Sequence, residues 1–249
     1  MSDILESRLD GRLLRLALNR PEKRNALNAA LCGDLTAALA AAEQNPDVGA
    51  ILLTGNGKGF SAGMDLDEAL TADPGTLADL QERLFTAYTW LTKPLIAAVH
   101  GAALAGGTGL AANAHIVIAS DDATFGLTEI RIGLWPFVIF RSVVAAMGER
   151  RCVELSLTGR IFGAAEAFSY GLVHKIVPAA ELESVALETA RAVADSSAAA
   201  LAAGLAFVQE SRGMSTEQVG RGARGYRQQI CEGEDFQQRV RQFRAKRNS

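Results

Sequence analysis

Cysteine is scarce in this sequence, and the few cysteines present lie far apart. Cys32, Cys152 and Cys231 form no C-x-x-C pair, and none has metal-ligand spacing to a histidine. This pattern excludes a disulfide framework of the small secreted kind and favours free thiols in a reducing compartment. The N-terminus also lacks the basic and then apolar segments of a secretory signal. We therefore expect a cytoplasmic protein without a bound metal.

An excess of charge of either sign is also missing. The 25 Lys and Arg residues nearly balance the 28 Asp and Glu residues, which gives a formal net charge of −3. No global basic field is therefore available to recruit nucleic acid or an anionic membrane. Hydrophobic residues make up 49% of the chain, which excludes a disordered protein. The 249 residues suffice for one large domain or two small ones.

Charged side chains are absent from the whole segment 94–120. A gap of this length must first be tested as a membrane span. Glycines, an asparagine and two histidines interrupt it, and patterns typical of globular helices and strands surround it. We expect two buried strands flanking a glycine loop, where a charge would be costly to bury.

Strand and helix patterns alternate along the first part of the chain, and helices alone follow Pro178. This order predicts an α/β core with crossover units and a helical C-terminal region. The expected strands cover 12–18, 50–54, 94–99, 115–119 and 173–177. The expected helices cover 25–44, 76–92, 105–113, 138–147, 151–157 and 164–170, before the helical remainder.

Two glycine loops match motifs of other enzyme classes. Residues 59–63 read G-x-S-x-G, so Ser61 with His174 is a candidate for serine hydrolysis, but the preceding strand ends too early for a tight elbow. Residues 107–112 read G-x-G-x-x-A, as in a dinucleotide site, but Asp121 follows too soon and the intervening helix is short. Both motif matches are weak, because the strands and helices expected around them do not fit a nucleophile elbow or a dinucleotide site.

A third interpretation takes the two loops together. Each follows a buried strand and offers an unhindered backbone N–H, with Ala62 and Gly106 as the natural donors of an oxyanion hole. Glu129 follows in apolar surroundings that would raise its pKa and make it a general base. Considered alone, Glu129 would instead be interpreted as a surface acid paired with Arg131.

The same segments resemble one family, the crotonase superfamily, also called the enoyl-CoA hydratase/isomerase family. The matching segments are NRP (19–21), NAL (25–27), KGFSAGMDL (58–66), KPLIAAVHGAALAGG (93–107), ATFGLTEIRIG (123–133), LTG (157–159), AAEA (164–167), GLV (171–173) and 235–247. They occur in order and cover nearly the whole chain, so together they are far more specific than any one of them.

The resemblance implies a spiral of ββα units with an acyl-CoA site over 1–195, and a helical region for trimerisation over 196–249. It implies a homo-oligomer, either a trimer or a hexamer of two trimers. It also implies a coenzyme A thioester as substrate, no separate cofactor, and the N–H groups of Ala62 and Gly106 as oxyanion donors beside Glu129. The candidate residues for binding the acyl-CoA are Lys23, Arg24, Ala26, Lys58, Gly63, Met64, Asp65, Leu66, Gly107 and Trp135.

The sequence departs from the family's hydratase pattern at one position. Hydratases that it resembles use two glutamates; the second matches Glu129, whereas the first is replaced by Gly109. Moving a double bond needs one base, whereas hydration must also position and deprotonate a water, so Gly109 favours isomerisation of 3-enoyl-CoA to 2-enoyl-CoA. Hydration of 2-enoyl-CoA and a non-catalytic acyl-CoA-binding role remain as alternatives.

Several other residues are candidates for a part in the site. The acids near the loops that could replace the missing glutamate are Asp65, Glu68, Asp121 and Asp122, and the hydroxyls that could orient a water are Thr108 and Thr128. Trp135, Phe137 and Phe140 are candidates for the wall of the acyl pocket or for core packing. The basic segment 212–249 is either a solvated helical face or a rim for the coenzyme A phosphates.

Overall fold

A six-stranded sheet forms the centre of the molecule. The computed structural model describes residues 3–247, so the first two residues and the expected end of the basic tail, Asn248 and Ser249, lie outside it. The strands are β1 (Leu5–Asp10), β2 (Leu13–Leu18), β3 (Ala50–Gly55), β4 (Leu95–Val99), β6 (Ile116–Ser120) and β9 (Lys175–Val177). Their order is β1-β2-β3-β4-β6-β9, and all neighbours are parallel except the antiparallel β1–β2 pair.

A smaller sheet lies beside the first and carries the glycine loops. Its strands are β5 (Ala102–Leu104), β7 (Thr124–Gly126) and β8 (Ile161–Gly163), in the order β5-β7-β8. Ser61 pairs with Ala103 of β5, because the Ser61 N–H donates to the Ala102 carbonyl oxygen and the Ser61 carbonyl oxygen accepts from the Leu104 N–H. This pairing draws the loop after β3 alongside the loop after β5.

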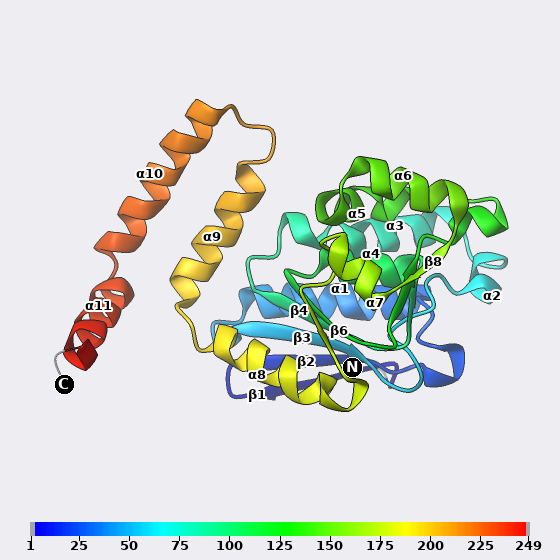
Figure 1. Ribbon diagram of the computed structural model, residues 1–249, viewed down its shortest axis with the longest axis horizontal. Helices are drawn as coiled ribbons and strands as arrows, with labels where there is room; N and C mark the ends of the chain where they lie inside the picture. Colours follow the sequence, from blue (N-terminus) through cyan, green and yellow to red (C-terminus); the bar gives the residue numbers. More distant parts are fainter. Residues whose placement is uncertain (1–2, 248–249) are drawn as a thin grey trace.

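Helices cover both faces of the large sheet (Figure 1). One face packs against α1 (Ala29–Gln44), whose leucines at four-residue spacing, Leu31, Leu35 and Leu39, are all buried, as the helical pattern predicts. The other face packs against α8 (Leu182–Ala194), whose buried alanines let the helix approach the strands closely. The remaining helices of the body are α2 (Leu66–Ala69), α3 (Pro74–Phe85), α4 (Gly106–Asn113), α5 (Phe140–Met147), α6 (Glu149–Thr158) and α7 (Ala164–Ser169).

Three C-terminal helices form an arm that stands apart from this body (Figure 1). They are α9 (Ala198–Glu210), α10 (Thr216–Glu232) and α11 (Glu234–Arg247), and none of the described residues in them is buried. The side chain of Gln209 donates to the Leu91 carbonyl oxygen, and the Arg212 guanidinium lies 4.7 Å from the centre of the Tyr88 ring. The arm therefore contacts the body near the end of α9.

The predicted α/β core is confirmed, and each expected strand and helix of the body has a counterpart. The charge-free segment contains β4, β5, α4 and β6, so it is strands and a short helix and not a span. No single helix among residues 3–247 is long and apolar enough to cross a membrane; the segments Ala179–Ala194 and Ala198–Glu210 pass such a test only together, across a bend of 97°. The strands β1, β5, β7 and β8 were not predicted.

Candidate active site

A largely apolar pocket of about 230 Å³ opens where the two glycine loops meet. Its polar side chains come from Gln81, Thr128, Glu129 and Trp135, so Glu129 supplies the one carboxylate among the described lining residues. Eight residues that the sequence offered as candidates for the site line it: Ala62, Met64, Leu66, Gly106, Thr128, Glu129, Trp135 and Phe137. The other lining residues are Leu27, Gln81, Phe85, Ala105, Ile132, Leu134, Pro136, Val138 and Ile139.

The two glycine loops are in direct contact at Gly63 and Gly106. Gly63 has φ +89°, and a side chain there would lie 2.7 Å from the Leu104 carbonyl oxygen and 3.2 Å from the Gly106 nitrogen. Glycine is required because it alone combines this backbone conformation with such a close approach. The contact brings the backbone on either side of Gly63 next to the first residue of α4.

Backbone N–H groups in these loops differ in whether they are already bonded. The N–H of Ala62 donates to the Arg24 carbonyl oxygen at 2.9 Å, so it is not free for a substrate. Met64 forms a parallel bridge with Leu27, and the two bonds of this bridge belong to the N–H of Leu27 and of Asp65. Because N–H directions alternate along an extended chain, the N–H of Met64 points away from Leu27.

The N–H groups of Met64 and Gly106 therefore remain available in the pocket. Neither donates to a partner within residues 3–247. Gly106 is the first residue of α4, where backbone N–H groups have no acceptor within the helix. The structure does not favour the predicted donor Ala62, since its N–H is already bonded within the protein, whereas the N–H of the other predicted donor, Gly106, and that of Met64 are not bonded within the described residues.

Glu129 begins the 3-10 helix Glu129–Ile132 and is 9% exposed. Its Oε2 atom is buried and has no hydrogen-bond partner among the described residues. Burial away from water raises the pKa of this carboxyl to about 7. No ion pair joins Glu129 to Arg131 in the described part of the chain, so the surface-pair interpretation is wrong. An unpartnered carboxyl with this pKa suits proton transfer near neutral pH.

The position of the missing acid is filled by apolar side chains. A Cβ atom at Gly109 would lie 2.3 Å from Ile139 Cγ2 and 3.1 Å from Phe85 Cε1. Ile139 and Phe85 are both buried and both line the pocket. Gly109 therefore faces the pocket wall, and the space a side chain would need there is already occupied.

Asp65 and Glu68, two candidate replacements for that acid, are bonded to other parts of the protein. Asp65 forms a buried ion pair with Arg20 at 2.9 Å and accepts from the N–H of Asp67 and Glu68 at the start of α2. Burial alone would raise the pKa of Asp65, but the Arg20 guanidinium and these N–H donors hold it below its ordinary value. The Glu68 carboxylate accepts from the Ala29 N–H at 2.6 Å. Neither acid lines the pocket.

The remaining candidates for that role are also accounted for. Asp122 accepts from the Ser120 hydroxyl, and neither it nor Asp121 lines the pocket. The buried Thr108 hydroxyl donates to the Ala103 and Gly126 carbonyl oxygens, so it is not free to orient a water. Thr128 alone of this group reaches the pocket.

Of the residues predicted to bind the acyl-CoA, Met64, Leu66 and Trp135 line the pocket, and the other seven do not. Lys23 is exposed and pairs with Asp67 at 2.8 Å. Arg24 and Lys58 are exposed on the two neighbouring loops, and Ala26 is buried beneath them. The others are structural in part: Asp65 fixes α2, and a side chain at Gly107 would lie 2.3 Å from the Ser61 carbonyl oxygen.

The two competing motifs are excluded by their surroundings. Ser61 is buried, and its hydroxyl donates to the Asn25 carbonyl oxygen at 2.9 Å. His174 Nδ1 accepts from the Val117 N–H of β6, and within the described residues no hydrogen bond joins His174 to the Ser61 hydroxyl. A Cβ at Gly107 would lie 2.3 Å from the Ser61 carbonyl oxygen, so the first glycine of the dinucleotide pattern packs against the Ser61 loop.

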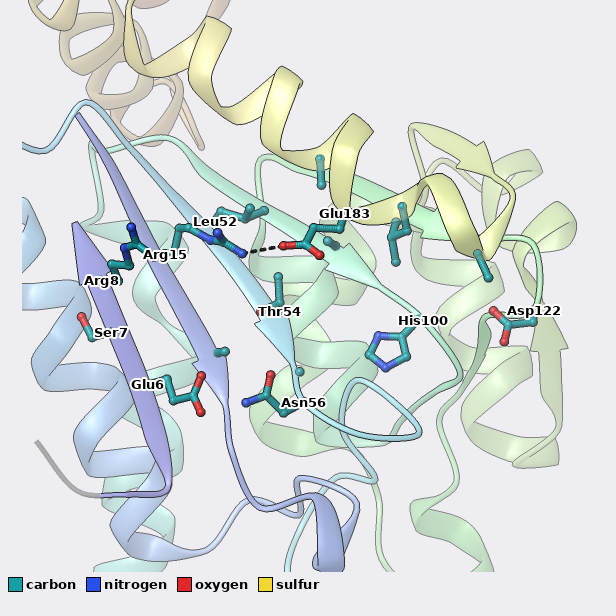
Figure 2. Close-up of a pocket in the computed structure, with 16 residues that line it drawn as sticks. Glu6, Ser7, Arg8, Arg15, Leu52, Thr54, Asn56, His100, Asp122 and Glu183 are labelled. Atoms are coloured by element: carbon teal, nitrogen blue, oxygen red, sulfur yellow. Dashed lines mark hydrogen bonds and ion pairs between the residues drawn. The ribbon is translucent and has the colours of Figure 1, made fainter. Parts of the chain in front are cut away.

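A larger hollow of about 680 Å³ lies on the opposite face of the sheet, beside α8 (Figure 2). Its lining mixes charged, polar and apolar side chains and includes an ion pair of 2.8 Å between Arg15 and Glu183. His100 and Asp122 point into it from the loops at the end of the sheet (Figure 2). No group of three or more His, Cys, Asp or Glu side chains within residues 3–247 is placed to hold a metal ion.

Comparison with known proteins gives one consistent result. The family model described as enoyl-CoA hydratase/isomerase matches residues 10–249. A probable enoyl-CoA hydratase of Mycobacterium tuberculosis is 40% identical over 197 residues, covering 77% of this chain and 75% of the relative. A 2,3-dehydroadipyl-CoA hydratase of Escherichia coli is 36% identical over 214 residues, covering 85% and 84%. The crystal structure of an enoyl-CoA hydratase from Mycobacterium smegmatis superimposes with a TM-score of 0.93 at 27% identity, covering 98% and 97%.

Proposed function

The chain belongs to the enoyl-CoA hydratase/isomerase family, and on that premise we propose that it isomerises 3-enoyl-CoA to 2-enoyl-CoA with a single carboxylate base. The observation that carries this proposal is the lining of the pocket. Glu129 is the one carboxylate there among the described residues, and the N–H groups of Met64 and Gly106 are free beside it. One base and one oxyanion hole are what the transfer of a proton along an acyl chain requires.

The reaction proceeds through a thioester enolate. The thioester carbonyl oxygen accepts hydrogen bonds from the N–H groups of Met64 and Gly106. Glu129 removes a proton from the α-carbon, and the electron pair of that C–H bond moves onto the thioester oxygen. The enolate then collapses as Glu129 returns the proton to the γ-carbon, which leaves the double bond conjugated with the thioester. Each oxyanion donor is worth roughly 2.7–4 kcal/mol of transition-state stabilisation.

Coenzyme A is proposed to lie across the loops at the mouth of the pocket. The exposed Lys23, Arg24 and Lys58 side chains are available to the phosphates. The pantetheine arm would follow the backbone between Gly63 and Leu66 toward the oxyanion hole. No separate cofactor is needed, because no step of the reaction transfers electrons or a group other than the proton.

Hydration of 2-enoyl-CoA is the second candidate, favoured by the names of the relatives. Those of M. tuberculosis and E. coli are both called hydratases. Against it stands Gly109, whose side-chain space Ile139 and Phe85 occupy, so that no second acid faces the substrate. A non-catalytic acyl-CoA-binding role gives no reason for an unpartnered carboxyl whose pKa lies near 7.

A homo-oligomer, either a trimer or a hexamer, is proposed from the arm over 196–249. The exposed side chains Phe236, Val240 and Phe243 recur at helical spacing on α11 and form an apolar stripe. Monomeric proteins rarely leave such a stripe in water. A second copy of the chain would cover it.

The test of the reaction offers both substrates side by side. With 3-enoyl-CoA, isomerisation produces the absorbance of a conjugated thioester; with 2-enoyl-CoA, hydration removes it. We expect the first change to be the faster. Faster loss of absorbance from 2-enoyl-CoA would replace the proposal with hydration. No change with either substrate, in an enzyme that still binds acyl-CoA, would favour the non-catalytic role.

A further inference from the structure

Ile139 and Phe85 form the wall of the pocket beside α4. Gly106 and Gly109 lie three residues apart on α4 and so share one face of the helix. The Phe85 ring spans both: a Cβ at Gly106 would lie 3.2 Å from Phe85 Cζ, and one at Gly109 would lie 3.1 Å from Phe85 Cε1. Ile139 is the closer neighbour of Gly109: a Cβ added at Gly109 would lie 2.3 Å from Ile139 Cγ2 and 2.8 Å from Ile139 Cβ.

The side chains of this wall have no hydrogen-bond donor or acceptor for a water molecule. Ile139 is 1% exposed and Phe85 is 2% exposed, and both belong to the main apolar core. A buried water needs two to four polar partners, and apolar cavities stay dry. The polar side chains that line the pocket are Gln81, Thr128, Glu129 and Trp135, and none of them belongs to α4. On the Gly109 side of the acyl chain, the Ile139 and Phe85 side chains therefore give a nucleophilic water nothing to bind.

We infer that Ile139, supported by Phe85, is the specificity-determining residue that keeps water out of the acyl pocket and so confines Glu129 to proton transfer. This inference rests on the proposed one-carboxylate isomerisation and names the side chain that enforces it. Gly109 is then glycine for a steric reason: Ile139 occupies the space that any other side chain would need.

The alternative chemistry is available as soon as water enters. Glu129 could take a proton from a water placed beside the β-carbon of 2-enoyl-CoA while the oxygen bonds to that carbon. The electrons of the double bond would move onto the thioester oxygen, held by Met64 and Gly106. Glu129 would then return the proton to the α-carbon, which gives 3-hydroxyacyl-CoA with all atoms of the water accounted for.

The first experiment measures the product ratio. Purified Ile139→Thr enzyme and the wild type are given 2-enoyl-CoA and 3-enoyl-CoA, and 3-hydroxyacyl-CoA is quantified against the isomerised thioester. We expect the ratio of hydration to isomerisation to rise roughly tenfold or more, because the new hydroxyl gives a water a polar partner on this wall and a tenfold change needs only a small difference in barrier. Val143→Thr adds the same hydroxyl to the adjoining α5 at a buried position that does not line the pocket, so it should leave the ratio unchanged.

A second experiment tests the occupied space without any activity. Gly109→Ala is made in the wild type and in the Ile139→Gly background, and urea unfolding is measured for all four proteins. We expect a clear loss of stability from Gly109→Ala in the wild type and a much smaller loss once Ile139 is removed. Equal losses in both backgrounds would overturn the assignment of this space to Ile139.

The outcomes separate this inference from the proposed function. A wild type that isomerises, with an Ile139→Thr ratio no different from it, overturns the role of Ile139 alone. A wild type that hydrates faster than it isomerises overturns both. A raised ratio in Ile139→Thr that Val143→Thr does not share supports the inference, and a simple loss of stability in the core would not produce it.

Discussion

Glu129 is a buried acid with one carboxylate oxygen that has no partner. A buried acid normally keeps a hydrogen bond or an ion pair at each oxygen, yet its Oε2 atom has neither among the described residues. In the proposed mechanism this oxygen is the one that accepts the proton of the substrate. The cost of this arrangement is a carboxyl whose pKa is raised to about 7. The burial that suits Glu129 to the proposed proton transfer therefore also lowers the stability of the folded protein when the carboxyl is ionised.

Replacing Glu129 with Gln tests its role as the base. We expect turnover of enoyl-CoA to fall by roughly two to four orders of magnitude, the usual contribution of a positioned general base. Binding of an acyl-CoA, measured by isothermal titration calorimetry, should persist because the shape of the pocket is kept. The exposed Glu188→Gln on α8 is the matched control and should retain its rate. Full activity in Glu129→Gln would refute the mechanism.

The same substitution has an opposite effect on stability. The carboxyl releases its proton near 4.5 in the unfolded chain but near 7 in the folded one. The folded state therefore holds a proton that the unfolded state has lost, and stability falls as pH rises from about 4.5 to 7. Above pH 7 the loss approaches about 3 kcal/mol. Urea unfolding should show Glu129→Gln more stable than the wild type at pH 8, with the difference shrinking at pH 5.

At the residue scale, the sequence predicted the apolar surroundings and the raised pKa of Glu129 but not which N–H groups beside it are unbonded. An acid amid apolar residues is visible in the sequence, and so is the glycine that lets α4 begin at Gly106. The direction of each N–H in the Ser61 loop is not visible, because it depends on pairing with Leu27 and Arg24 from a distant segment. That pairing uses the N–H of Ala62 and leaves the N–H of Met64 free.

At the scale of elements, the loop that carries Met64 is fixed by the start of α2. Asp65 caps this helix and pairs with Arg20, and both side chains are largely withdrawn from water. Asp67, two residues later, forms an exposed pair with Lys23. The two aspartates thus offer a buried and an exposed ion pair on the same short element.

Asp65→Asn should destabilise the protein by about 3–5 kcal/mol, because it leaves the Arg20 guanidinium buried without its counter-charge. The loop would also lose its cap, so kcat for enoyl-CoA should fall as the N–H of Met64 moves. Asp67→Asn breaks only an exposed pair and should cost less than about 1 kcal/mol. Urea unfolding and steady-state kinetics on both variants provide the check. Equal effects of the two substitutions would contradict this assignment.

Element prediction failed mainly where strands are short. β5, β7 and β8 each span three residues, too few for an alternating pattern to show, and they are defined by the neighbours that pair with them. The side chains contributed by α3 were missed for a related reason. Phe85 and Gln81 lie on an amphipathic helix whose existence was predicted, but only tertiary packing turns them toward Gly106 and Gly109.

At the scale of the whole molecule, the body and the arm differ in how far their apolar residues are buried. The body buries its apolar residues in two cores, one on each face of the sheet. The arm buries none of its described residues, although α9 is made largely of Ala and Leu. Its internal contacts are sparse: the Phe207 ring meets Tyr226 edge-on, and the Ser197 hydroxyl donates to Asp235. Such a structure needs further contacts to be stable.

Phe243→Asp tests whether a second copy supplies those contacts. Phe243 is 64% exposed and belongs to the apolar stripe with Phe236 and Val240 on α11. If this stripe is an interface, placing a charge in it should lower the mass measured by analytical ultracentrifugation from that of a trimer or hexamer toward that of one chain. Gln237→Asp adds the same charge to an exposed position of α11 outside the stripe and should leave the assembly intact. A monomeric wild type, or an assembly that Phe243→Asp does not weaken, would show that the arm is stabilised in another way.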